Sequence, residues 1–150
     1  MIRLIGIVLS GWLLIPSAYA QPCAPTVMVK ATGTAIPVEE ALTRQQRIQG
    51  LMNRDKLTAR TGMWFVFEDD AERSFWMRNT RIPLDIVYVD RTGKIVRIIK
   101  NATPYSERGL PSGAPARFVL EVNGGEAAVL GLTEGGFVHT CGTPGPITAQ

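Results

Sequence analysis

Short runs of apolar residues recur along the chain, some alternating with polar residues and others continuous, and turn-forming residues separate them. Runs of this kind are typical of β-strands. We expect strands at residues 26–30, 35–38, 63–67, 84–89, 94–99, 117–122 and 137–140. The turn at residues 90–93 joins two of these strands and predicts a hairpin.

Two short segments carry helix signals instead. Thr43 and Gln46 have the spacing of a capping box, and the apolar residues that follow recur at helical intervals, which predicts a helix at residues 44–52. Residues 126–130 are good helix formers and are followed by Gly131, which can end a helix in the left-handed conformation.

Residues 101–116 carry no clear strand or helix pattern and contain several Pro and Gly residues. A connection of this length is uncommon in a compact domain. Two interpretations stay open: a binding loop or lid, or an Ω-loop packed on the surface through Tyr105 and Leu110. Many short strands with two brief helices predict a mainly β (α+β) fold, either a compact antiparallel β sandwich or a partly closed barrel.

The N-terminus has the pattern of a secretory signal peptide. Arg3 precedes an apolar stretch at residues 4–15, and residues 18–20 form a small-residue cleavage site. The apolar stretch is shorter than the ~20 residues of a membrane span, and Cys23 lies too far from the cut for lipid attachment. We therefore expect a signal peptide at residues 1–20, no stable membrane span after cleavage, and a periplasmic or secreted protein.

The remaining residues, 21–150, are enough for a single β-rich domain, with a flexible Gly- and Pro-rich tail at about residues 142–150. Loss of Arg3 lowers the basic residues from 16 to 15, which against 13 acidic residues leaves a net charge of about +2. The charges are scattered, so nucleic acid is not an expected partner.

Two cysteines lie near the ends of the mature chain. Cys23 and Cys141 should pair as a disulfide in an oxidising compartment. A metal role is disfavoured, because there is no Cys-x-x-Cys and His139 is the only histidine. We expect neither a metal nor a cofactor.

The segment at residues 75–85, with the sequence FWMRNTRIPLD, mixes large apolar and polar side chains to a degree that local structure rarely requires. Together with residues 50–54, 62–67 and 119–125 it resembles the small envelope-protein family catalogued as domain of unknown function 192. The resemblance covers about residues 38–138. It implies a mainly β fold and a secreted location, and it brings no assigned activity.

Residue types for catalysis are scarce. The chain lacks a nucleophile elbow, a phosphate-binding glycine loop and a zinc-protease motif. Asp85 and Glu121 lie within apolar segments, where an acid must be paired or have a raised pKa. They could be a general acid and base, as in glycoside hydrolysis. The favoured interpretation is structural or ligand-positioning, with bonds to Arg54, Arg78 or Arg81.

Trp76 and Met77 should point to opposite sides if their segment is extended, so one of them should lie in the core. The simpler interpretation assigns Met63, Phe65, Met77 and Ile86 to ordinary packing. The alternative makes Trp76 an aromatic platform for sugars, carboxylates or peptide backbone.

Three functions remain in view: a non-catalytic binding or accessory module of the cell envelope, a carboxylate-dependent hydrolase acting on an envelope polymer, and a structural or assembly partner of another envelope protein. We favour the binding module, with an unidentified small molecule, glycan or peptide as its ligand, because the chain lacks a nucleophile. The candidate ligand-binding residues are Arg54, Trp76, Arg78, Asn79, Asp85 and Glu121.

Overall fold

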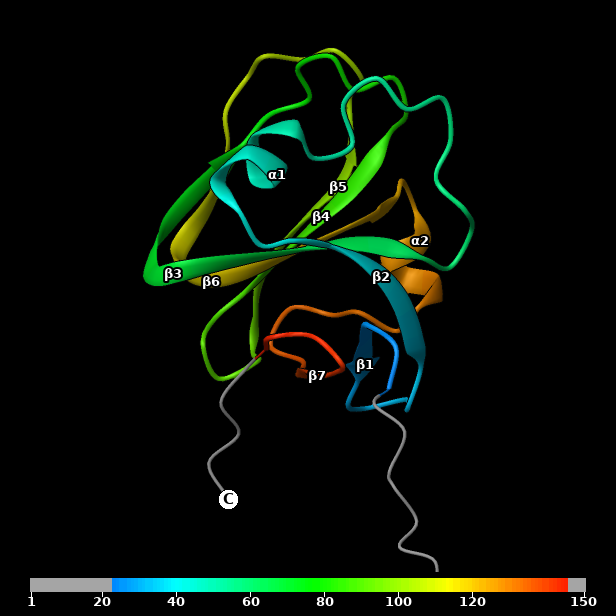
Figure 1. Cartoon of the computed structure of the whole chain (residues 1–150), viewed down its shortest axis with the longest axis vertical. Coiled ribbons are helices and arrows are strands. Elements are labelled where there is room, and N and C mark those ends of the chain that lie inside the picture. Colours follow the sequence, from blue (N-terminus) through cyan, green and yellow to red (C-terminus); the bar gives the residue numbers. More distant parts are fainter. Residues whose placement is uncertain (1–22, 146–150) are drawn as a thin grey trace, which may run out of the picture.

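The computed structural model describes residues 23–145, so the predicted signal peptide at residues 1–20 and the end of the predicted tail lie outside the described residues. Seven strands form one curled sheet in the order β5-β4-β6-β3-β2-β1-β7 (Figure 1). The strands are β1 (Thr26–Val29), β2 (Ala35–Ala41), β3 (Gly62–Phe75), β4 (Leu84–Val89), β5 (Ile95–Ala102), β6 (Leu110–Asn123) and β7 (Val138–Cys141). The helices are α1 (Arg44–Gln49) and α2 (Glu126–Val129).

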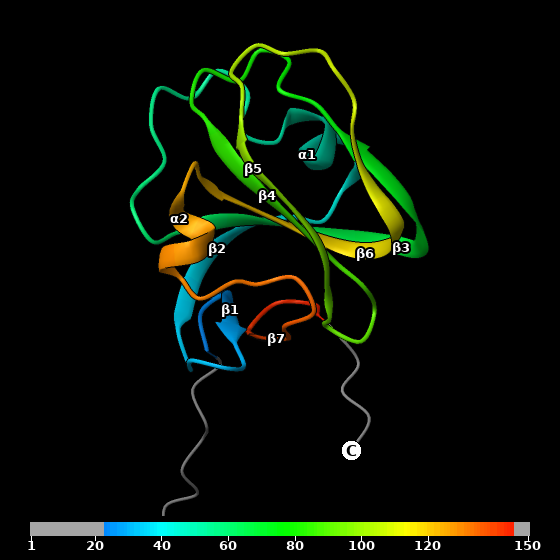
Figure 2. The same ribbon diagram turned by 180° about the vertical axis from the view of Figure 1, so that it is seen from behind.

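The predicted mainly β class is confirmed, and of its two alternatives the partly closed barrel is the one found. Neighbouring strands are antiparallel except β2 and β3, which run parallel across the connection that contains α1. The segment before β7 bonds both to β5 and to the end of β1, because Ile95 N–H donates to Gly136 and Lys30 N–H donates to Phe137. This segment brings the two ends of the sheet together (Figure 2).

The sheet has a hydrophobic layer on each face, as strand alternation requires. One layer contains Trp64, Val87, Phe118 and Leu120 and is covered by α2 through Ala127. The other layer lies on the side of α1, and its buried residues are Ala41, Leu51, Met63, Phe65, Met77, Leu84, Ile86, Tyr88, Ala102, Ala116 and Val119. The prediction that Met63, Phe65, Met77 and Ile86 are packing residues is confirmed.

The predicted loop at residues 101–116 is wrong over its second half, because residues 110–116 belong to β6. Two prolines made this segment look irregular. Pro111 and Pro115 pair only with β3 in this region, since the pairing of β4 with β6 ends at Phe118. A proline is tolerated in a strand whose other side has no neighbour, because its missing N–H breaks no ladder bond there.

The predicted helix at residues 44–52 is shorter in the structure. Its capping box is present: the Thr43 hydroxyl accepts from Gln46 N–H, and the Gln46 side chain accepts from Thr43 N–H. The helix stops at Gly50, where φ is +45° and the Cβ of another residue would lie 3.3 Å from the Phe65 ring. Contact with the sheet therefore ends the helix before the apolar pattern does.

The Cα atoms of Cys23 and Cys141 lie 5.8 Å apart, so the fold allows the predicted disulfide between the entry to β1 and the end of β7. The indole N–H of Trp64 donates to Pro144 at 3.0 Å, which brings the first residues of the predicted tail back onto the core. Within residues 23–145 no helix combines the length and the apolar character that crossing a bilayer requires.

Candidate functional site

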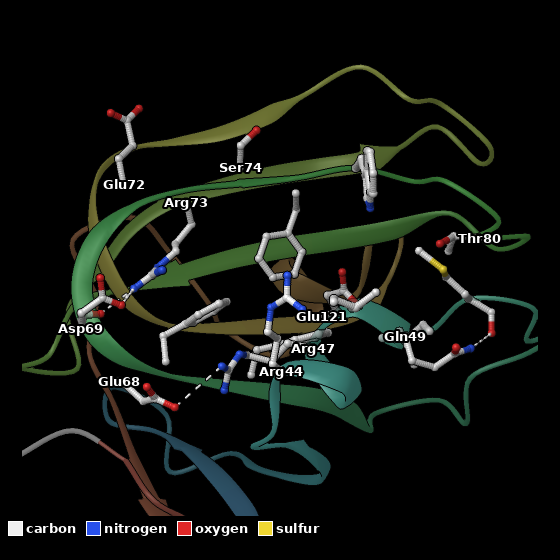
Figure 3. Close-up of a pocket in the computed structure, with 18 residues that line it drawn as sticks. Arg44, Arg47, Gln49, Glu68, Asp69, Glu72, Arg73, Ser74, Thr80 and Glu121 are labelled. Atoms are coloured by element: carbon white, nitrogen blue, oxygen red, sulfur yellow. Dashed lines mark hydrogen bonds and ion pairs between the residues drawn. The ribbon is translucent and has the colours of Figure 1, made fainter.

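A pocket of about 550 Å³ lies between α1 and the far half of β3 (Figure 3). The loop after α1 and the start of the segment after β3 complete its wall. The residues that line it are Arg44, Arg47, Ile48, Gln49, Gly50, Leu51, Met52, Phe65, Phe67, Glu68, Asp69, Glu72, Arg73, Ser74, Phe75, Trp76, Thr80 and Glu121. The predicted platform Trp76 and the predicted acid Glu121 are both among them.

Glu121 comes to this pocket from β6, a central strand of the sheet. Its strand neighbours are Met63 on β3 and Ile86 on β4, so the acid occupies a position in the hydrophobic layer below α1. Only 4% of its surface is exposed. Among the described residues, no hydrogen bond or ion pair is formed with its side chain. Burial alone raises the pKa of Glu121 to about 8.

A carboxyl group with such a pKa is protonated at neutral pH. It then offers one O–H donor and acceptor capacity besides. Because Glu121 lines the pocket, its carboxyl oxygens are free to form hydrogen bonds with a ligand bound there. A buried polar group without a partner is uncommon in a protein interior and is a reason to look for a ligand.

Two arginines of the pocket wall are engaged by the protein itself. The guanidinium carbons of Arg47 and Arg73 lie 5.1 Å and 4.1 Å from the ring centre of Phe67. Arg47 also donates to two backbone carbonyls and lies 4.0 Å from Glu68. Arg73 donates to Asp69 at 2.6 Å, and this bond lowers the pKa of that acid. These arginines hold the wall in shape.

The mouth of the pocket combines exposed apolar and polar side chains. Ile48 on α1 is 56% exposed and Trp76 after β3 is 46% exposed, and both line the opening. Figure 3 shows Arg44 reaching from α1 across the opening, in the direction of the β3 wall. The pocket therefore has an apolar and aromatic interior, one neutral acid at its floor and a polar entrance.

Asp85 lies on the other face of the sheet. It precedes Ile86, which pairs with Glu121, so the side chains of the two acids point in opposite directions. The oxygens of Asp85 accept from Asn101 N–H at 2.8 Å and from Ala127 N–H at 2.9 Å. The first bond fixes the end of β5 and the second fixes the start of α2. The contacts of Asp85 are therefore those of a structural residue.

The predicted arginine partners of the buried acids are wrong. Each of these arginines is close to an exposed acid instead: Arg54 to Glu39 at 2.6 Å and 2.7 Å, Arg81 to Asp55 at 2.6 Å, and Arg78 to Glu107 at 3.9 Å. The bond to Arg54 lowers the pKa of Glu39. These arginines are partly exposed, and pairing with a surface carboxylate does not require either charge to lose all of its hydration. Pairing with a buried acid would require it.

Four of the six candidate residues thus lie outside the pocket: Asp85 on the other face of the sheet, and Arg54, Arg78 and Asn79. Arg54 lines a separate hollow of about 530 Å³ beside β2. Arg78 stands with its guanidinium carbon 5.5 Å from the ring centre of Trp76. Asn79 has a φ of +53°, and its carbonyl accepts from Asn53 N–H at 2.8 Å. Asn tolerates this left-handed conformation better than most residues, so the backbone conformation explains why position 79 is an Asn.

Sequence reasoning missed several residues of the pocket wall, notably Arg44, Gln49, Ser74 and Phe75. The capping box located α1, but nothing in the local pattern indicated which part of the sheet α1 covers. Over the described part of the chain, no group of three or more His, Cys, Asp or Glu side chains is arranged to hold a metal ion.

Comparisons with known proteins place the chain among relatives of the same fold. The model of the family DUF192, described as "Uncharacterized ACR", matches residues 27–140. One similar crystal structure is of a protein of unknown function from Novosphingobium aromaticivorans DSM 12444. It is 39% identical, the match covers 83% of this chain and 89% of that one, and the TM-score is 0.72.

A second similar crystal structure comes from Sinorhizobium meliloti 1021 and carries the provisional description of transcription regulator. It is 34% identical, the match covers 77% of this chain and 91% of that one, and the TM-score is 0.71. No curated protein matches the chain.

Proposed function

This chain belongs to the family DUF192, and we propose that it is a non-catalytic binding module of the cell envelope that holds a small ligand in the pocket between α1 and β3. The observation that carries the proposal is Glu121, a buried carboxyl group without a partner among the described residues, at the floor of a pocket of about 550 Å³. Pockets of this size are typical of small-molecule sites.

Binding is favoured over the carboxylate-dependent hydrolase. That reaction needs two carboxyl groups on either side of one scissile bond. Asp85 and Glu121 are separated by the sheet, and Asp85 is occupied by two backbone N–H groups. Among the other acids of the pocket wall, Asp69 is held by Arg73 and Glu68 lies beside Arg47. The side chain of Glu72 points away from the pocket (Figure 3).

The envelope location rests on the signal-peptide pattern at residues 1–20 and on the two cysteines that the fold places close together. It is tested by intact-mass analysis of periplasmic and secreted material. We expect a chain that begins at Gln21 and has no alkylatable thiol before reduction. A full-length chain in the cytoplasm, or two free thiols, would contradict this part of the proposal.

Regulation of transcription, the provisional description of the Sinorhizobium relative, is not proposed for this chain. Its charges are scattered rather than gathered into a basic face, and an exported protein does not meet DNA. The assembly-partner alternative called for an exposed apolar patch. Of the exposed large apolar residues, Ile48 and Trp76 line the mouth of the pocket. The others are Leu42 before α1, Tyr105 after β5, Val129 in α2 and Phe137 before β7, so no single element carries an apolar patch.

Ligand binding can be followed through Trp76, because this side chain lines the pocket and is partly exposed, whereas Trp64 is fully buried. The mature protein would be titrated with envelope-derived glycans, short peptides and small polar compounds while tryptophan emission is recorded. We expect a saturable change with one of these classes.

The matched variants are Ile48→Phe and Trp76→Phe. Ile48 is an exposed residue of α1 at the mouth of the pocket, so a phenyl ring there narrows the entrance with little effect on folding. Ile48→Phe should weaken binding at least about tenfold with an unchanged melting temperature, and Trp76→Phe should remove the optical signal. Binding that is unchanged in Ile48→Phe would show that the ligand lies elsewhere.

A further inference from the structure

Among the described residues, Glu121 is the one acid in the deep part of the pocket. Its strand neighbours Met63 on β3 and Ile86 on β4 are apolar, as are the pocket residues Leu51 and Phe65. Tyr88 on β4 also lies within electrostatic reach, and its hydroxyl donates to the carbonyl of Leu110. Glu121 itself is 4% exposed. A ligand that fills this part of the pocket therefore needs an apolar body and one polar group directed at the floor.

The cations at the entrance do not make the pocket an anion site. Arg47 and Arg73 are held by carbonyls, by Glu68 and Asp69, and by the Phe67 ring between them. Arg44 is exposed at the mouth, where water screens its charge. An anionic group at the floor would instead face a carboxyl group that has no countercharge.

Aromatic side chains supply the other half of a cation site. Phe65, Phe75 and Trp76 line the pocket, and Phe65 and Phe75 meet edge to face with ring centres 5.1 Å apart. The faces of aromatic rings attract organic cations, and the attraction grows when water is excluded. An ammonium group beside a carboxylate forms a charge-assisted hydrogen bond that is about twice as strong as a neutral one.

We infer that the ligand of this pocket is an organic amine with an apolar body, whose ammonium group lies against the ionised carboxylate of Glu121. The inference rests on the proposed binding function and names the chemical class of the ligand. Without a ligand, Glu121 keeps its proton because the group is buried. When the ammonium ion binds, Glu121 loses its proton to solvent. One positive charge therefore enters the pocket and one leaves it.

This exchange gives the site a pH dependence that a neutral ligand would not have. Burial raises the pKa of Glu121 to about 8, so below that value each bound amine must displace a proton. The affinity for an amine should then rise about tenfold per pH unit up to about pH 8 and level off above it. The other charged side chains of the pocket wall are Arg44 and Arg47 on α1 and Glu68, Asp69, Glu72 and Arg73 on β3. Arg47 lies beside Glu68, and Arg73 donates to Asp69.

The test compares benzylamine with benzyl alcohol, which has nearly the same shape and no charge. Each is titrated calorimetrically into the mature protein between pH 6 and pH 8, in two buffers of different ionisation enthalpy. We expect benzylamine to bind at least about tenfold more tightly than benzyl alcohol at pH 8, with release of about one proton per ligand at pH 6.

Glu121→Gln keeps the size of the side chain and removes its ionisation. This variant should bind benzylamine at least about tenfold more weakly, release no proton and still accept benzyl alcohol. The matched control is Glu107→Gln, the same chemical change at an exposed acid that does not line the pocket, and its affinities should equal those of the wild type.

The outcomes separate the ligand class from the function itself. Equal binding of both probes without proton release, or benzylamine binding that survives Glu121→Gln, overturns the amine class and leaves a binding pocket in place. Absence of binding by both probes also overturns the amine class. The proposed function fails if no ligand class binds, or if the mouth variant Ile48→Phe leaves the binding of every ligand class unchanged.

Discussion

Asp85 and Glu121 lie on adjacent strands, one residue apart in register, and both are almost fully buried. Asp85 faces the layer below α2, where the backbone N–H groups of Asn101 and Ala127 bind its oxygens. Glu121 faces the layer below α1, where apolar side chains surround it and a pocket opens above it. The same kind of side chain thus stabilises the fold on one face and lowers its stability on the other.

The difference shows how a buried acid can be assigned. An acid whose oxygens are saturated by backbone donors is accounted for by the fold. An acid that is buried without a partner lowers stability, and proteins retain such groups mainly at functional sites. Loss of Asp85 should therefore be felt in stability, and loss of Glu121 in binding.

The largest expected effect is on the pH dependence of stability. The ordinary pKa of a glutamate is 4.5, and in the folded protein it is about 8 for Glu121. Between these values the unfolded chain loses a proton that the folded protein keeps, so stability falls as pH rises, by about 1.4 kcal/mol per pH unit. In urea unfolding at pH 5 and pH 8, Glu121→Gln should lack this loss. If the wild type and Glu121→Gln lose the same free energy of unfolding between pH 5 and pH 8, Glu121 is not buried as described.

The second effect is the loss of the Asp85 bonds. Asp85→Ala leaves two buried backbone N–H groups without acceptors and should lower the free energy of unfolding by about 3 kcal/mol. Asp85→Asn keeps one acceptor oxygen and should lose about half as much. Chemical denaturation measures both variants, and an unchanged midpoint for Asp85→Ala would contradict the structural role.

The third effect has the opposite sign. Glu121→Leu replaces an unpaired buried acid by an apolar side chain of similar length and should stabilise the protein by about 1 kcal/mol at pH 6. The same variant should lose the ability to bind an amine. Destabilisation by Glu121→Leu would indicate that the carboxyl group has a partner in the folded protein, and the comparison with Asp85 would then collapse.

The smallest effect is expected at Arg78. Its guanidinium lies 3.9 Å from Glu107 at the surface, and Asp85 has other partners. Arg78→Ala should change the free energy of unfolding by no more than about 0.5 kcal/mol. Combined with Asp85→Ala, its effect should be additive, because the two residues share no contact. Strong coupling in this double-mutant cycle would restore the predicted arginine partner.

Much of the fold could be predicted because its signals are local. The strand at residues 84–89 follows from a nearly continuous apolar run, typical of a strand buried on both faces. The turn after it follows from Asp90, whose carboxylate accepts from Thr92 N–H and Lys94 N–H. The capping box placed the start of α1 correctly. The extra length of β3 and β6 could not be predicted, because those ends are strands only through pairing with each other.

The candidate site was predictable only in part. Trp76 and Glu121 line one pocket in the structure. The sequence drew attention to them because Trp76 lies close to polar residues and Glu121 is an acid in an apolar strand. Arg78 was grouped with them because it is close to Trp76 along the chain, and Arg54 because it belongs to the family-like segment at residues 50–54. In the folded protein each arginine lies beside a surface acid instead, Glu39 and Glu107 respectively.

The sequence by itself determined that Asp85 and Glu121 would be buried, because each lies among apolar residues in a strand whose pattern is local. Only the tertiary structure decided what burial means for each of them. The donors to Asp85 come from residues 16 and 42 positions away along the chain. The pocket above Glu121 exists because α1 and β3 meet over β6. Such contacts depend on which distant segments become neighbours, and no local pattern of side chains contains that information.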